Sequence, residues 1–142
     1  MFKKHLKNQK GLTLIELLAV IVILGIIAAI AVPAIGNVIN NSKEKATYAE
    51  AQQIIDAAKL YIAGENPASY PITINKGLSA GTTDTNQLDG YLQKQPSKYK
   101  LVISKDASTG ELTFTLSNHE ANTIGETPDT ALTEDEIAGK LD

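Results

Sequence analysis

The 142-residue sequence contains no cysteine, no tryptophan and no arginine. The absence of cysteine excludes disulfide bonds and thiol chemistry. The absence of arginine removes the side chain that most often reads bases and phosphates, and the net charge of −3 also argues against a nucleic-acid-binding protein. Aromatic residues are few, with two Phe and five Tyr. A soluble domain built from this chain therefore has a small core and would gain stability by packing on a larger element.

Enzyme motifs are also missing. The sequence contains no nucleophile elbow, P-loop, HExxH motif or Cys/His cluster. The acids between Asp84 and Asp106 lack the spacing of an EF-hand calcium loop. His5 and His119 are isolated, and His119, which stands beside Glu120, is expected to be solvated. The sequence therefore predicts neither an enzyme nor a bound metal or cofactor.

What the chain does contain is a long apolar run near its N-terminus. Residues 1–11 (MFKKHLKNQKG) are basic, and residues 12–35 (LTLIELLAVIVILGIIAAIAVPAI) follow as an apolar segment. As a helix, this segment is long enough to cross the ~30 Å hydrocarbon core of a membrane. The lysines that precede it predict a cytoplasmic N-terminus and an outward-facing remainder. Glu16 lies inside the run, and a charge at mid-bilayer depth costs roughly 2.5–3.5 kcal/mol, so this carboxylate is expected to be paired or functional.

The helix is expected to continue past the apolar run, and residues 36–64 have the pattern of an amphipathic helix. Their apolar side chains recur with a helical period and form a stripe that is predicted to dock a head domain. The stripe consists of Ala51, Ile54, Ile55, Ala58 and Tyr61. Gly64 and Asn66-Pro67 signal the end of the helix. Gly25 and Pro33 interrupt the predicted helix and are expected points of bending or local unwinding.

Residues 65–142 are predicted to form a small head with a β-hairpin and an acidic C-terminal tail. Apolar and polar residues alternate over 99–103 and again over 112–116, across the turn-rich segment 105–110. Shorter signals predict a strand at 70–74, a loop at 76–85, a helical turn at 86–92 and a capped helix from 133 to 141. Residues 118–132 are polar and weakly patterned, which is compatible with a folded or a disordered tail.

The residues around Gly11 resemble a known family. Gly11 followed by Leu-Thr-Leu-Ile-Glu-Leu-Leu, behind a lysine-rich leader, resembles the type IV prepilins, a class that comprises pilins and type II secretion pseudopilins. The resemblance is dense over residues 7–48. It implies that a prepilin peptidase removes the leader between Gly11 and Leu12 and methylates the new amine of Leu12, where the family usually has Phe. Glu16 then becomes the fifth residue of the mature chain, and Gly25 and Pro33 fall where pilins place a Gly and a Pro.

The physical chemistry of this segment agrees with the resemblance. Cleavage would create an ammonium at Leu12, four residues before the carboxylate of Glu16. Two unpaired charges in hydrocarbon are costly, whereas an amine of one subunit and a carboxylate of its neighbour offset each other. Glu16 is therefore expected to be an assembly contact.

The resemblance implies an α+β, pilin-like fold and a structural subunit that polymerises into a type IV pilus for adhesion, motility or DNA uptake. The implied partners are other copies of the chain in a helical homopolymer, the prepilin peptidase, a membrane platform protein and an assembly ATPase. The implied location is the cell membrane before assembly and the cell-surface pilus afterwards, with nucleic acid met only by the assembled pilus. Many Gram-negative pilins close a C-terminal loop with a disulfide, so the missing cysteines predict a Gram-positive source.

Other interpretations start from the same segment. A secretory signal peptide could be cut near Ala29-Ile30-Ala31, but Glu16 would disrupt its apolar region and the predicted helix continues past that site. A signal anchor could carry an unrelated binding domain or an enzyme. A major pseudopilin of type II secretion is the alternative within the family.

Overall fold

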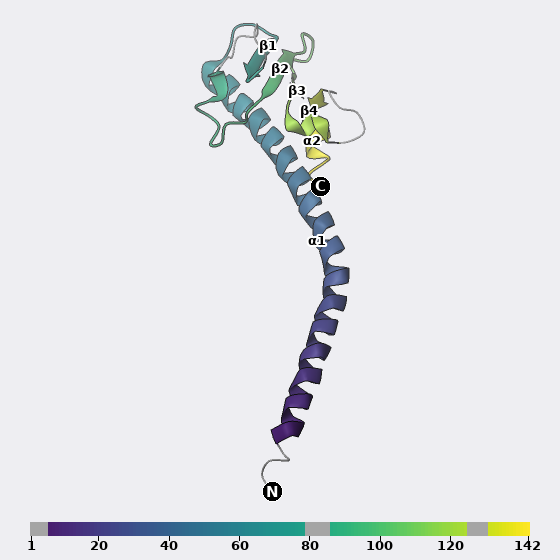
Figure 1. Cartoon of the computed structure of the whole chain (residues 1–142). Coiled ribbons are helices and arrows are strands. Elements are labelled where there is room, and N and C mark those ends of the chain that lie inside the picture. The colour runs from purple at the N-terminus through teal and green to yellow at the C-terminus, as the bar shows by residue number, and fades with distance from the viewer. Residues whose placement is uncertain (1–5, 79–85, 125–130) are drawn as a thin grey trace. The chain divides into compact units, whose positions relative to one another are not determined.

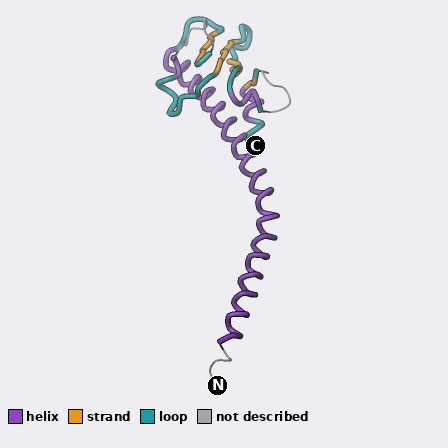
Figure 2. The backbone as a smooth tube through the Cα atoms, viewed as in Figure 1, coloured by secondary structure: helices purple, strands orange, loops and turns teal. Residues whose placement is uncertain are grey.

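The structure, a computed structural model, describes residues 6–78, 86–124 and 131–142, with side chains described from Thr13 onward (Figures 1 and 2). The chain divides into two compact units, Met1–Asn41 and Ser42–Asp142. The elements are α1 (Leu6–Glu65), β1 (Ile72–Lys76), η1 (Asn86–Leu88), β2 (Tyr99–Lys105), β3 (Leu112–Ser117), η2 (Glu120–Thr123), β4 (Leu132–Thr133) and α2 (Glu134–Ala138).

The described part of the first unit is helical. α1 begins at Leu6 and continues as α-helix through Gly25 and Pro33. Pro33 has no amide hydrogen, so one hydrogen bond, to the carbonyl of Ala29, is missing there, but the Ile-, Leu- and Ala-rich turns on both sides keep the helical conformation. The structure thus has no break at either residue, and local unwinding at Gly25 and Pro33 stays a prediction for the assembled state.

The apolar side chains of this unit lie on its surface. Leu14 is 68% exposed and Ile30 is 72% exposed, although both belong to the longest apolar run of the chain. Within the described residues, α1 from Thr13 onward is the one helix long and apolar enough to cross a membrane, and its apolar window is not buried in the chain. An exposed apolar surface of this size calls for lipid or other protein as its surroundings.

The second unit contains the rest of α1 and a four-stranded antiparallel sheet of order β1-β2-β3-β4, whose strands are labelled in Figure 1. The register aligns Ile74, Leu101, Leu116 and Leu132 in one row across all four strands. Alternate residues point to the same face, so this row and its neighbours form an apolar inner face. The inner face and the apolar stripe of α1 form a single buried cluster, which is the core of the unit.

The predicted fold class is confirmed, and several details of the head are corrected. The predicted hairpin is present as β2 and β3, and the predicted turn at 86–92 contains η1. β1 begins at Ile72 instead of Tyr70, because Pro71 has no amide to donate to a neighbouring strand. At its other end the strand extends to Lys76. The predicted loop at 76–85 therefore begins later, and its residues 79–85 lie outside the described part of the chain.

The segment after Asn118 is more ordered than its weak pattern predicts. It contains η2 and the two-residue strand β4, neither of which was expected. α2 has the predicted capping box between Thr133 and Glu136, but the helix ends at Ala138 instead of Leu141, and residues 139–141 continue as turns in which the amides of Lys140 and Leu141 donate to carbonyls three residues earlier. Residues 125–130 of the predicted tail lie outside the described residues.

Candidate assembly segment and its head

Glu16 is the carboxylate of the apolar part of α1. It lies on the helix surface among exposed apolar residues such as Leu14 and Leu18. In the described chain, no hydrogen-bond or ion-pair partner contacts its side chain. A charged group on such a surface is costly in hydrocarbon unless a cation pairs with it.

Gly11 and Leu12 precede Glu16 on the same helix. The backbone of both residues belongs to α1, and their side chains lie outside the described part of the structure. Leu12 and Glu16 are four residues apart, which places them about one helical turn from each other. Lys7 and Lys10 of the leader are also in α1, whereas Lys3 and Lys4 fall outside the described residues.

The predicted docking stripe faces the sheet. Ala51, Ile54, Ile55 and Ala58 are completely buried, and Tyr61 is partly buried against the same cluster. Their helical spacing brings the side chains onto one face, which the inner face of the sheet covers. The structure therefore brings all five predicted residues together.

Polar contacts that no sequence pattern predicted hold the C-terminal segment against α1. The Tyr48 hydroxyl donates to the carbonyl of Ile124 at 3.2 Å. The Lys59 ammonium forms an ion pair with Glu134, and the Lys45 ammonium donates to the carbonyl of Leu141 at 3.1 Å. The paired residues are 75 to 96 positions apart along the chain, so no local pattern could reveal them.

His119 is buried, contrary to the expectation that it is solvated. Only 4% of the residue is exposed, because its ring closes a capping box at the start of η2. The amide of Ala121 donates to Nδ1 at 3.1 Å, and the amide of His119 donates to Oδ1 of Asn122 at 3.0 Å. A His-x-x-Asn capping box differs in residue type from the usual Ser/Thr-x-x-Glu pattern, which explains why the sequence did not predict it.

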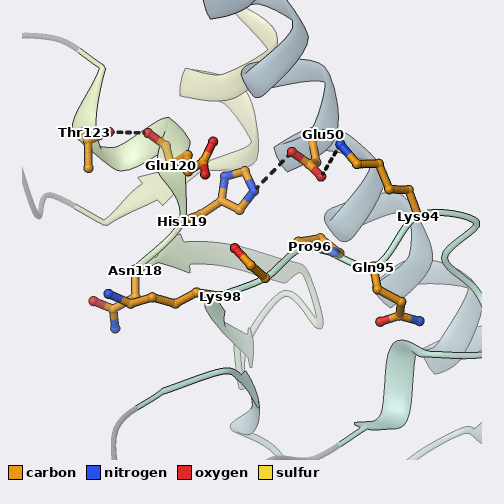
Figure 3. A pocket seen from close by; sticks show the side chains of 10 residues that line it. Glu50, Lys94, Gln95, Pro96, Lys98, Asn118, His119, Glu120 and Thr123 are labelled. Carbon is orange, nitrogen blue, oxygen red and sulfur yellow. Dashed lines mark hydrogen bonds and ion pairs between the residues drawn. The ribbon is translucent and has the colours of Figure 1, made fainter.

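A polar pocket of about 380 Å³ opens beside His119 (Figure 3). The His119 ring and the Lys94 ammonium both approach the carboxylate of Glu50, with Nε2 at 4.0 Å and Nζ at 3.5 Å. Burial lowers the pKa of His119, although the negative charges of Glu50 and Glu120 act in the opposite direction. Within the described residues, no group of three or more His, Cys, Asp or Glu side chains could hold a metal ion.

Comparisons with known proteins point to one family. The family model "Prokaryotic N-terminal methylation motif" matches residues 6–32. The chain is similar to the type IV major alpha-pilin of Moraxella bovis, with 32% identity over 126 residues that cover 84% of this chain and 76% of the relative. It is also similar to a fimbrial protein of Pseudomonas aeruginosa, with 32% identity over 120 residues that cover 84% and 75%. No solved structure matches it significantly.

The Gram-positive source expected from the missing cysteines finds no support, because these relatives are Gram-negative pilins. The family is structural and non-enzymatic, which agrees with the absence of enzyme motifs from the sequence. It also implies processing by a prepilin peptidase, polymerisation and a location in cell-surface pili. The methylation motif over the first part of α1, the helix packed on an antiparallel sheet and the similarity along most of the chain agree with one another, and the chain belongs to the type IV pilin family.

Proposed function

We propose that the chain is cut between Gly11 and Leu12, methylated at Leu12, and incorporated into a pilus through an ion pair between Glu16 of one subunit and the Leu12 amine of its neighbour. The observation that carries this proposal is the exposed Glu16 on an otherwise apolar helical surface. The cost of a charge in hydrocarbon, roughly 2.5–3.5 kcal/mol, favours any assembly that pairs it.

Location and partners follow from the same segment. The unprocessed chain resides in the cell membrane through residues 12–35, and the mature chain leaves the membrane as α1 packs against the helices of other subunits. A membrane platform protein and a cytoplasmic ATPase drive this transfer, and local unwinding at Gly25 and Pro33 accommodates the packed state. The stripe from Ala51 to Tyr61 keeps the head attached to α1 throughout.

A pilus is favoured over a secretion pseudopilus. The similar proteins are named as a type IV major alpha-pilin and as fimbrial proteins, and the similarity extends well beyond the N-terminal motif that pilins and pseudopilins share.

The replacement Glu16→Ala tests the ion pair. The variant removes the carboxylate and keeps an apolar helix, so it should remain in the membrane but be lost from filaments sheared off the cells. Membrane fractions and sheared filaments, compared by immunoblot, give both quantities. Glu44→Ala is the matched control, because Glu44 is an exposed carboxylate of α1 outside the apolar run. Normal piliation by Glu16→Ala would refute the pairing.

A further inference from the structure

A second pocket, of about 500 Å³, lies on the outer face of the sheet, opposite the face that packs on α1. The register places Asn75 of β1 directly opposite Lys100 of β2, and Thr73 lies two residues away on the same face. The residues used below are Thr73, Asn75, Lys98, Lys100 and Asn118. We refer to this site as the lysine pocket.

The lysine pocket is suited to an anion. Two ammonium groups, two amides and a hydroxyl line it, and its described lining includes no carboxylate. The described residues form no ion pair with Lys98 or Lys100, whereas Lys59, Lys76 and Lys94 each contact an acid. Lys98 and Lys100 thus have no ion-pair partner among the described residues, although Lys98 also lines the pocket that contains Glu50 and Glu120. A further carboxylate would be attracted to the two lysines.

The first turn of α2 presents three acids at the other end of the sheet, next to the edge strand β4. Two of them already have partners, because Glu134 pairs with Lys59 and Glu136 accepts a hydrogen bond from the amide of Thr133 at 2.8 Å. Asp135 is exposed, and the described residues form no contact with its carboxylate. Among the described residues, Asp135 therefore has no ion-pair partner, and the same is true of Lys98 and Lys100 on the same head.

We propose that the lysine pocket of one subunit binds Asp135 and the acidic first turn of α2 on a second copy of this chain. This inference rests on the proposed function, because it concerns how the heads meet in the filament. The pocket lies over β1 and β2, whereas α2 adjoins β4 at the opposite edge of the sheet. Two different complementary surfaces on one subunit make a head-to-tail contact, which propagates along a filament instead of closing a dimer.

The contact also moderates repulsion between heads. Acidic residues outnumber lysines in the head, so identical heads repel one another unless unlike charges face each other. A single exposed ion pair is weak, but the same contact recurs at every subunit of a filament and acts together with the pairing at Glu16.

Chemical crosslinking tests the contact, because the chain contains no cysteine. Lys98→Cys and Asp135→Cys are introduced together, and sheared filaments are treated with a short bismaleimide. A lysine–aspartate pair can hold its α-carbons farther apart than the ~7 Å that a disulfide can bridge, so a crosslinker is preferable to oxidation. The double variant should give a ladder of multimers on a denaturing gel, and each single variant should stay monomeric.

The matched control combines Lys98→Cys with Glu111→Cys, since Glu111 is an exposed acid of the turn between β2 and β3 and does not belong to α2. Filaments of the Asp135 double variant that give no ladder, an equal ladder in the control, or dimers of Lys98→Cys alone would overturn the contact. Those results leave the Glu16 pairing untouched, whereas failure of the unmodified chain to form filaments would contradict the proposed function instead.

A second pair of variants, which exchanges the two charges, tests the contact even if the cysteine variants do not form filaments. Lys98→Asp should reduce the yield of sheared filaments several-fold, and adding Asp135→Lys should restore it. A double variant that assembles no better than Lys98→Asp would overturn the contact.

Discussion

His119 is buried although the residues on either side of it in the sequence are exposed. Its neighbours Asn118 and Glu120 are polar and exposed, so local composition predicts a solvated side chain. The ring instead turns inward, because Nδ1 accepts the Ala121 amide and the Asn122 side chain donates to the carbonyl of Leu116 at 3.0 Å. These bonds satisfy backbone groups where β3 ends and η2 begins, and such an arrangement depends on the fold.

The burial of His119 predicts a pH dependence of stability. Its pKa in the folded chain is lowered from the ordinary 6.5, chiefly by desolvation, so the folded state disfavours protonation. The contribution of the neutral ring is fully present above pH 6.5 and is lost as the pH falls from there through the lower folded pKa. Urea unfolding of the full chain in detergent, followed at several pH values, should show this loss.

Glu50→Gln separates the two influences on His119. The carboxylate of Glu50 raises the pKa of the ring against the larger effect of burial, so its removal should lower that pKa further. NMR titration of the His119 ring in both proteins measures the difference. A higher pKa in the variant, or a ring that titrates like free histidine in the unmodified chain, would contradict the buried placement.

At the scale of elements, the strong periodic patterns predicted α1, β2 and β3, whereas the short elements η2 and β4 were not predicted. The alternation in β2 and β3 and the stripe on α1 were visible because each buries one face over several residues. β4 has two residues, too few to display a period, and it exists because β3 offers it an edge to pair with. The contacts of Lys45, Tyr48 and Lys59 with the C-terminal segment likewise required the fold.

The packing of α1 on the sheet predicts a contrast between two residues of the same helix. Ile54 is completely buried in the core, whereas Leu60 is 59% exposed. Ile54→Ala should lower the free energy of unfolding of the head by about 2–5 kcal/mol, because it removes buried methyl groups and leaves a cavity. Leu60→Ala should change it by less than about 0.5 kcal/mol, as expected for a surface site.

Chemical denaturation of both variants in the same detergent measures these two changes. Equal destabilisation by Ile54→Ala and Leu60→Ala would show that the sheet does not cover the predicted face of α1.

At the scale of the whole molecule, the N-terminal segment identifies the family. Its family could be predicted from a handful of residues because Gly11, Leu12 and Glu16 stand at fixed spacing on an apolar background. The source organism could not be predicted in the same way. The C-terminal segment is held against α1 without a disulfide, by contacts such as Lys59 with Glu134. The missing cysteines therefore did not indicate the source, and the similar pilins come from Gram-negative bacteria.

The intact mass of the protein sheared from the cell surface tests the central claim most directly. We predict the mass of residues 12–142 plus one added methyl group, because in the proposed function cleavage after Gly11 releases the amine of Leu12, which is then methylated and pairs with Glu16. Gly11→Phe should leave the full-length, unmethylated precursor in the membrane. A sheared protein that retains residues 1–11, or one that begins at a residue other than Leu12, would contradict the account.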